Sequence, residues 1–483
     1  MMLAAAMTGC GKDFLERQPQ GRFTTETYPG GQFEQYIYGM YAQLRDYNVH
    51  VMPFIATAGI RSDDADKGST PADGADQKAM DEFTIAPSSG LVKAYYTGLY
   101  AGVNKCNLVL QQVALATGNV SEADKKVSIA EAKMLRGYFY FNLVRAFGGV
   151  PKVDSLITDE AKFNIPRASK EAIYAMIEAD LAVAVTDLPM KWDPKYIGRV
   201  TKGAAQSLLA KVYLYEKKYA QALSMTTAVI NSGVYSLQPS YSYLFTEDGE
   251  NCSESVFEVQ ALYTAAYTTY GCQYAQVQGI RGAGQFNQGW GFNVPSAALA
   301  AAYEAGDPRR DATILYAGET TPYGETLPLT LPNPMYNQKV YSNPKVRTQN
   351  NSAFGQWMNV RLLHYSDVLL MHAEAAEELG QTDEALAKLE IVRARARGNN
   401  TGILPKITER DPVKLTDLIR NERRIELAME QERFYDIVRW GIARKTLAAA
   451  GKNNYVDGKH ELLPIPQDEM DKAQGVLVQN PGY

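Results

Sequence analysis

The sequence has few of the residues that build metal sites and disulfide frameworks. Its 483 residues include only 4 His and 4 Cys. No two cysteines form a C-x-x-C pair, so there is neither a zinc signature nor a disulfide framework. A single bridge between Cys252 and Cys272 stays open in an oxidising compartment. His364 and His372 fall on one predicted helix without H-x-x-x-H spacing, and we expect core or surface histidines rather than metal ligands.

Long apolar runs and an excess of one charge are also missing. No stretch approaches the ~18 consecutive apolar residues that a membrane-spanning helix needs. The net charge of −5 argues against nucleic-acid binding, which needs a basic face. No G-x-S-x-G, Walker or strand-bound G-x-G-x-x-G motif is present, so the sequence predicts no cofactor.

Tyrosine, by contrast, is abundant, with 31 Tyr against 15 Phe. A tyrosine ring offers a flat apolar face together with a hydroxyl group, which suits surfaces that are both adhesive and hydrated. The excess therefore suggests a binding surface, although tyrosines also pack wherever the hydroxyl reaches water.

Most of the chain shows helical periodicity. Apolar residues recur at helical spacing in 30–47, in 91–115 and in AEAKMLRGYFYFNLVRAFGGVP, which ends at Gly148, Gly149 and Pro151. The segment LIRNERRIELAMEQERFYDIVRW predicts a further helix over 418–440. The polar, Gly- and Pro-containing stretch RSDDADKGSTPADGADQ predicts a loop between helices.

A repeat connects two distant parts of the chain. AKVYLYEKKYAQAL (210–223) and AEAAEELGQTDEAL (373–386) align without a gap, each with a short polar turn followed by Ala-Leu. Tetratricopeptide helix pairs are built in this way. Residues 167–185 fit another half of such a unit. The units are scattered, so we expect a helical scaffold with a loop-rich insert over roughly 235–360, containing a short strand in SVFEVQALY.

Several segments together resemble one family, the SusD/RagB-like nutrient-binding lipoproteins of Bacteroidota. CGKDFLERQP is similar to the family's mature N-terminus, and AEAKMLRGYFYFNLVRAFGGVP to its first tetratricopeptide helix. Three further segments resemble the family's C-terminal half. They are GWGFNVPS followed by GDPRRDATI, then ERRIELAMEQERFYDIVRWG, and finally LLPIPQDEM with QNPGY. The resemblance implies a mainly α-helical fold with four tetratricopeptide-type pairs, divided into regions 10–235 and 236–483.

The resemblance also explains the N-terminal sequence of the chain. Residues 1–9 are similar to the end of a lipoprotein signal, although no basic residue precedes the apolar run. Cys10 would become the lipid-bearing N-terminus, with the two-chain attachment that stable anchoring needs. The alternative is an ordinary N-terminus with a stray cysteine. The expected location is the extracellular face of the outer membrane, beside a SusC-like TonB-dependent transporter.

A sugar-binding surface needs aromatic faces with polar groups nearby. Trp290, flanked by Asn287 and Gln288 on a Gly-rich loop, fits this need, although it could instead fill the junction between scaffold and insert. Four tyrosines would share one face if 263–274 were helical, and would serve packing on a strand. Tyr95 and Tyr96 stand where many family members carry a tryptophan. The candidate glycan contacts are Trp290, Tyr263, Tyr267, Tyr270, Tyr274, Tyr95, Tyr96, Asn287, Gln288, Asp63 and Asp64.

Two groups of acids allow alternatives. Asp63 and Asp64 lie in a densely acidic loop that could bind sugar hydroxyls, hold calcium without full EF-hand spacing, contact the transporter, or remain solvated. Glu422, Glu426 and Glu430 share a predicted helix face, where neighbouring arginines favour a salt network over catalysis.

The resemblance and the aromatic residues predict a non-catalytic protein. It would capture a glycan at the cell surface and deliver it to the transporter. The alternatives are a repeat-based protein adaptor without sugar affinity, or a helical glycoside hydrolase.

Overall fold

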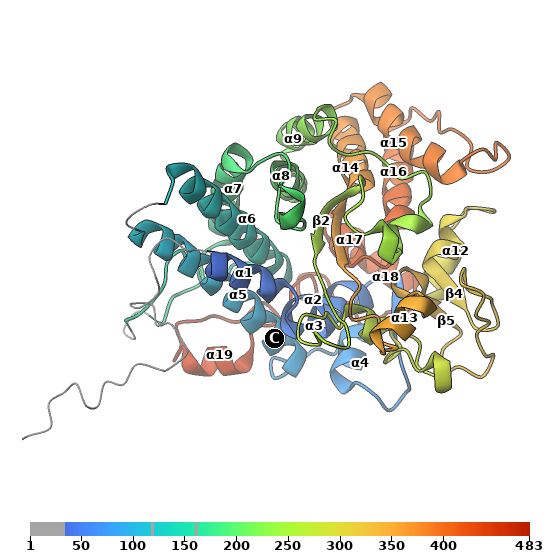
Figure 1. The fold of residues 1–483 in the computed structure, drawn as a ribbon, viewed down its shortest axis with the longest axis horizontal. Coiled ribbons are helices and arrows are strands. Elements are labelled where there is room, and N and C mark those ends of the chain that lie inside the picture. Colours follow the sequence, from blue (N-terminus) through green and yellow to red (C-terminus); the bar gives the residue numbers. More distant parts are fainter. Residues whose placement is uncertain (1–33, 117–119, 160–162) are drawn as a thin grey trace, which may run out of the picture.

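The computed structural model describes residues 34–116, 120–159 and 163–483, and Figure 1 shows how these parts are arranged. The predicted signal remnant 1–9 and Cys10 therefore lie outside the described residues. Within the described ranges, no helix combines the length and the apolar character that crossing a bilayer requires.

The scaffold is a row of helices in which chain neighbours pack side by side (Figure 1). Its members are α5 (Gly90–Leu115), α6 (Glu122–Phe147), α7 (Lys170–Asp187), α8 (Lys202–Tyr215), α9 (Tyr219–Asn231), α14 (Tyr365–Glu378), α15 (Thr382–Arg397) and α16 (Pro412–Glu426). Helix α9 packs directly against α14, so the row continues across the inserted segment between them. The expected helical scaffold with a loop-rich insert is confirmed.

The sequence repeat corresponds to two equivalent helix pairs, α8 with α9 and α14 with α15. At matching positions of the two turns, Lys217 has φ 57° and Gly380 has φ 72°. Both residues therefore adopt the left-handed conformation that ends the first helix and reverses the chain. Helices α6, α7 and α8 begin with side-chain caps from Ser121, Ser169 and Thr201.

The remaining helices flank the row or belong to the insert. They are α1 (Glu34–Leu44), α2 (Tyr47–His50), α3 (Met52–Ile55), α4 (Ala75–Asp81), α10 (Tyr274–Gln278), α11 (Ala297–Ala300), α12 (Arg309–Thr313), α13 (Pro344–Asn350), α17 (Arg433–Arg439), α18 (Ala443–Ala449) and α19 (Gln467–Lys472). The predicted helix over 418–440 is wrong as one element. It breaks between α16 and α17 because Met429 and Gln431 have φ values of 65° and 67°.

In the described parts of the chain, six short strands form three antiparallel pairs. They are β1 (Ala65–Gly68) with β3 (Phe292–Pro295), β2 (Ser255–Val259) with β6 (Val360–His364), and β4 (Ile314–Tyr316) with β5 (Met335–Asn337). The predicted strand in SVFEVQALY is confirmed as β2. Strand β1 falls inside the stretch predicted to be a loop, and its register pairs Gly68 with Phe292. This pairing joins the N-terminal part of the chain to the insert.

Close packing of α5 on α6 depends on Gly102. A Cβ atom there would lie 2.5 Å from the ring of Phe139, which is fully buried in α6. We expect Gly102→Ala to lower the free energy of unfolding by about 1–3 kcal/mol, since overpacking displaces the ring. Denaturant titration of the chain lacking residues 1–10 measures the change.

The matched control is Gly39→Ala in α1, where no atom lies within 4 Å of the added Cβ. There the loss of a flexible helical glycine should stabilise the protein by roughly 0.5–1 kcal/mol. Equal effects of the two substitutions would contradict the packing argument.

Candidate functional site

Four exposed or half-buried aromatic rings from three segments form two neighbouring pairs. Tyr47 is 36% exposed, Tyr267 56% and Tyr270 48%, and Trp290 is half-buried. The Tyr47 and Trp290 ring centroids are 6.5 Å apart, and those of Tyr267 and Tyr270 are 6.3 Å apart. We call these four residues the aromatic row. Arg45, two residues before Tyr47, places its guanidinium 5.9 Å from the Tyr270 ring and so connects the two pairs.

Backbone hydrogen bonds fix Trp290 beside Tyr47. The Trp290 amide donates to the Gln276 carbonyl at 2.9 Å, and the Ser69 amide donates to the Gly291 carbonyl at 2.5 Å. Gly68 has φ 70°, and a Cβ there would lie 2.4 Å from the Gly291 oxygen, so a glycine is required. Trp290 is half-buried and also packs against the main core, as the alternative of junction filling requires, and glycan binding at this residue stays a prediction.

The tyrosines of 263–274 lie on a loop that reverses direction, so the helical alternative is wrong. The Leu262 amide donates to the Tyr270 carbonyl at 2.9 Å, and a tight turn closes between Thr264 and Tyr267. Tyr263 is half-buried against a small apolar cluster around Trp357. Tyr274 begins α10, and its hydroxyl accepts a hydrogen bond from Gln431 at 3.1 Å. Tyr267 and Tyr270 are therefore the two whose rings reach solvent most fully.

The polar neighbours of Trp290 divide in the same way. Asn287 is exposed, whereas Gln288 is buried and donates to the Gln285 carbonyl at 3.0 Å. The Asn287 side chain is therefore accessible to a ligand, whereas Gln288 stabilises the loop.

Tyr95 and Tyr96 face the core rather than the aromatic row. Tyr95 is 0% exposed, and its hydroxyl donates to Asn142 at 3.3 Å. Tyr96 is 4% exposed and meets Phe147 edge-on, with centroids 5.1 Å apart. The expectation that they form a sugar platform is corrected, because α5 turns this face onto α6. Tyr96 also lines a separate pocket of about 690 Å³ beside α19.

Asp63 and Asp64 are buried in ion pairs, which corrects their prediction as exposed sugar or calcium ligands. Arg424 contacts Asp63 at 2.9 Å and Asp64 at 2.7 Å, and Arg433 contacts Asp63 at 2.8 Å. Burial alone would raise the pKa of Asp63, but Arg433 and Arg424 lower it below its usual value. The two arginines come from α16 and α17, a proximity that local sequence does not reveal.

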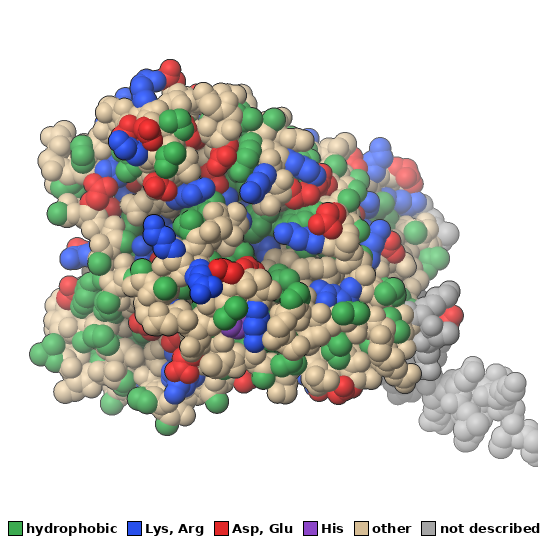
Figure 2. Space-filling model, turned by 180° about the vertical axis from the view of Figure 1, so that it is seen from behind, with side chains coloured by type: hydrophobic (Ala, Val, Ile, Leu, Met, Phe, Trp, Pro, Cys, Tyr) green, Lys and Arg blue, Asp and Glu red, His purple; other side chains and the backbone are tan. Residues whose placement is uncertain are grey.

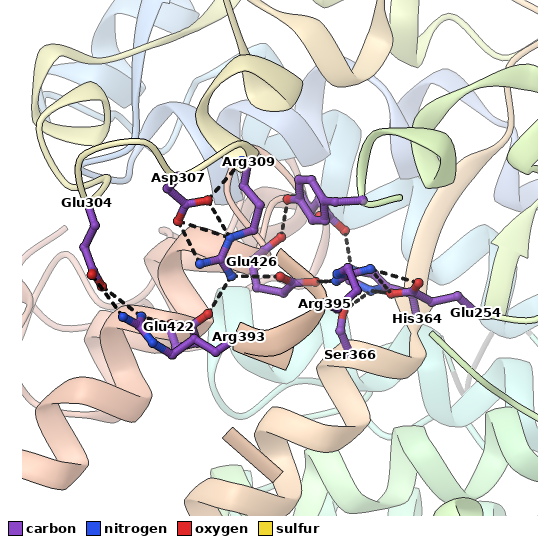
Figure 3. A network of polar contacts seen from close by, with 12 residues as sticks. Glu254, Glu304, Asp307, Arg309, His364, Ser366, Arg393, Arg395, Glu422 and Glu426 are labelled. Carbon is purple, nitrogen blue, oxygen red and sulfur yellow. Dashed lines mark hydrogen bonds and ion pairs between the residues drawn. The ribbon is translucent and has the colours of Figure 1, made fainter. Parts of the chain in front are cut away.

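A second buried network surrounds α16 (Figure 3). Arg309 donates to Glu422 at 2.6 Å and to Glu426 at 3.1 Å, while Arg393 donates to Glu422 at 2.9 Å. The salt network expected at Glu422 and Glu426 is confirmed. Glu430 lies beyond the end of the helix, so it does not share that face, and pairs with Lys339 at 2.6 Å.

One part of this network has the composition of a metal site. Ligand atoms of Glu254, His364 and Glu426 lie within 4.8 Å of one another. However, Arg395 donates to Glu254 at 3.1 Å and also pairs with Glu426, so a cation already neutralises the carboxylates. His364 ends β6 rather than sharing a helix with His372, which lies within α14. We therefore interpret the three residues as part of the buried salt network.

Two further observations concern charge and cysteine. Cys252 and Cys272 are both free, so the bridge left open by the sequence is not formed. Figure 2 shows basic and acidic side chains interspersed over one face, without an extended basic area.

The fold is thus a scaffold of helix pairs with solvent-facing aromatic rings from α2 and from the insert. Comparison with known proteins identifies the family. Residues 231–483 match the model of the SusD family, and residues 13–214 match a model described as "Starch-binding associating with outer membrane". The chain therefore belongs to the SusD family.

Individual relatives match over nearly the whole chain. SusD-like protein P2 of Formosa agariphila is 27% identical, covering 100% of this chain and 98% of the relative. A solved laminarin-binding SusD-like protein is 30% identical, with TM-score 0.79, covering 93% and 98%. Surface glycan-binding protein A of Bacteroides thetaiotaomicron, solved with laminarihexaose, is 25% identical, with TM-score 0.77 and coverage of 93% and 98%.

The buried network predicts that the protein is most stable at a pH between the pKa values of Glu426 and His364. Burial alone would lower the pKa of His364, but Glu430 and Glu254 raise it to about 10. Its protonated ring therefore stabilises the fold fully below pH 6.5, and this contribution is lost as the pH rises toward 10. Burial alone would raise the pKa of Glu426, but Arg395 and Arg309 lower it to about 2, so its contribution is lost as the pH falls from 4.5 toward 2.

We expect His364→Gln to lower stability near neutral pH and to remove much of the decline between about pH 6.5 and 9. Urea unfolding at several pH values measures this. His372→Gln is the control, because burial lowers the pKa of His372 and gives it no alkaline contribution. An unchanged alkaline slope in His364→Gln would contradict the assignment.

Proposed function

We propose that this protein binds oligosaccharides at the cell surface with its aromatic row and delivers them to a TonB-dependent outer-membrane transporter. The observation that carries the proposal is the proximity of solvent-facing rings from distant segments, since Tyr47 lies 6.5 Å from Trp290 and Arg45, two residues before Tyr47, lies 5.9 Å from the Tyr270 ring. Covering exposed rings of this size with a ligand removes apolar surface from water, which favours binding. Flat rings suit the apolar faces of sugar rings, and Asn287 and Arg45 lie near enough to contact hydroxyl groups.

The solvent exposure of the aromatic row suits a protein that releases its ligand to a partner rather than one that retains it. A shallow surface with many weak contacts gives modest affinity, because ordering the ligand offsets much of the contact energy. Modest affinity permits fast release to a partner. The names of the relatives that bind laminarin and laminarihexaose support a glucan-like or related glycan.

The proposed anchor is Cys10, processed after removal of residues 1–9. The sequence before Cys10 supports a lipoprotein signal, and one matched family model is described as associating with the outer membrane. Two or more acyl chains would hold the protein stably, whereas one chain gives only reversible attachment. The proposed orientation is toward the extracellular face, beside a SusC-like transporter.

We further propose that the protein is not an enzyme. Glycoside hydrolysis needs two carboxyl groups that flank the substrate bond. Glu422, Glu426 and Glu430 are each paired with a basic side chain, which leaves them unsuited to proton transfer. This pairing disfavours the hydrolase alternative at these acids.

The binding proposal predicts that aromatic-row variants lose affinity. Calorimetric titration of the chain lacking residues 1–10 against laminarihexaose and oligomers of xylose, mannose and galactose should find at least one ligand. Trp290→Ala should weaken binding about tenfold or more, because truncating a central aromatic anchor costs about 2 kcal/mol. Tyr270→Ala should act in the same direction.

Tyr243→Ala is the matched control, since Tyr243 is 39% exposed and lies outside the aromatic row. If the aromatic-row variants bind the glycan as tightly as the unmodified chain, the pocket near Tyr96 becomes the candidate site. If no glycan of the panel binds, the adaptor alternative is favoured. Turnover of a sugar would favour a hydrolase.

The anchor proposal predicts the fate of Cys10→Ala. In a bacterial host that processes lipoproteins, the unmodified chain should partition into the membrane fraction and the detergent phase. The variant should leave both, because it offers no thiol for acylation. Membrane retention of Cys10→Ala equal to that of the unmodified chain would contradict lipid attachment at this residue.

A further inference from the structure

A small pocket adjoins the aromatic row on the side of Arg45. It measures about 170 Å³ and lies between α1 and the loop that precedes α8. Its walls include Tyr38, Tyr41, Arg45, Lys195, Tyr196 and Gln260. Arg45 lines this pocket and also lies 5.9 Å from the Tyr270 ring, so a ligand covering Tyr270 could extend one residue into the pocket.

The basic side chains of this pocket include two without an acidic partner. No carboxylate of the described residues lies within 4.0 Å of the Arg45 guanidinium or the Lys195 ammonium. Arg199, which lines the same pocket, differs because it is paired with Glu131. Two cations therefore face the pocket uncompensated, in a chain whose net charge is −5.

The acidic residue of the lining does not neutralise them. Glu258 accepts hydrogen bonds from the Asn251 amide at 3.1 Å and from Asn359 at 2.8 Å. It is 3% exposed, and both of its carboxylate oxygens already accept hydrogen bonds from within the protein. Burial lowers the pKa of Arg45, because its charge has lost water without gaining a carboxylate.

We propose that this pocket binds an acidic group of the glycan, either a uronate carboxylate or a sulfate ester. The inference rests on the proposed function and narrows its ligand class. An arginine fork matches the oxygens of either group and forms charge-assisted hydrogen bonds about twice as strong as neutral ones. Tyr38 and Tyr196 would contact the ring that carries the acid, and Lys195, being exposed, would add attraction at the entrance.

The test compares matched acidic and neutral ligands by calorimetry on the chain lacking residues 1–10. Hexagalacturonate is set against its carboxyl-reduced counterpart, and a sulfated galactan hexamer is set against the desulfated one. We expect at least one acidic member to bind about tenfold or more tightly than its neutral match. The pair that shows the preference identifies carboxylate or sulfate as the group.

Arg45→Gln should reduce this preference at least tenfold, and Lys195→Gln should reduce it less. The preference should also fall as salt rises from about 50 to 500 mM, because screening weakens charge attraction. Arg410→Gln, which removes an exposed arginine paired with Asp383, should leave the preference unchanged. Thermal melting establishes that Arg45→Gln is folded, and Lys195→Gln gives an independent test at an exposed position.

The outcomes separate this inference from the proposed function. Equal binding of acidic and neutral ligands, or a preference that survives both substitutions, would overturn the acidic-group assignment while leaving glycan binding intact. Failure of every glycan to bind would overturn both.

Discussion

The pairing of β1 with β3 is the constraint on which the binding surface depends. It brings the N-terminal segment against the insert, and it sets Trp290 beside Tyr47. The start of β1 is held in turn by Asp63 and Asp64, which pair with Arg424 and Arg433. Because removing one partner would leave a buried charge uncompensated, these contacts specify one arrangement even where their net contribution to stability is small. Three distant parts of the chain thus meet at one place.

Charge is used in two opposite ways in this molecule. Around α16 the acids and bases are buried together and neutralise one another, with Arg309, Glu422 and Glu426 as the centre (Figure 3). That network holds the insert against the helical row, and its carboxylates are not free for catalysis. At the pocket beside the aromatic row, Arg45 and Lys195 have no acidic partner among the residues that the structure describes. Internal pairing serves the fold, and the unpaired cations can serve a ligand.

Much of the scaffold could be predicted from sequence because its signals are local. Helical periodicity and the repeated turn at Lys217 and Gly380 each act within a few residues. Contacts between distant segments left no such signal. The acidic loop resembled an exposed loop because Arg424 and Arg433 lie far along the chain. Tyr95 and Tyr96 were predicted from position within the family, yet α5 directs them inward. Tyr47 and Arg45 were missed because only the fold places them beside Trp290 and Tyr270.

The central claim is that ligand rings lie on the aromatic row. A crystal structure of the chain lacking residues 1–10, grown with the tightest ligand of the glycan panel, tests it most directly. The account predicts sugar rings packed on Trp290, Tyr47 and Tyr270, with one residue of the glycan reaching Arg45. Ordered sugar in the pocket between α5 and α19, with the row unoccupied, would contradict it.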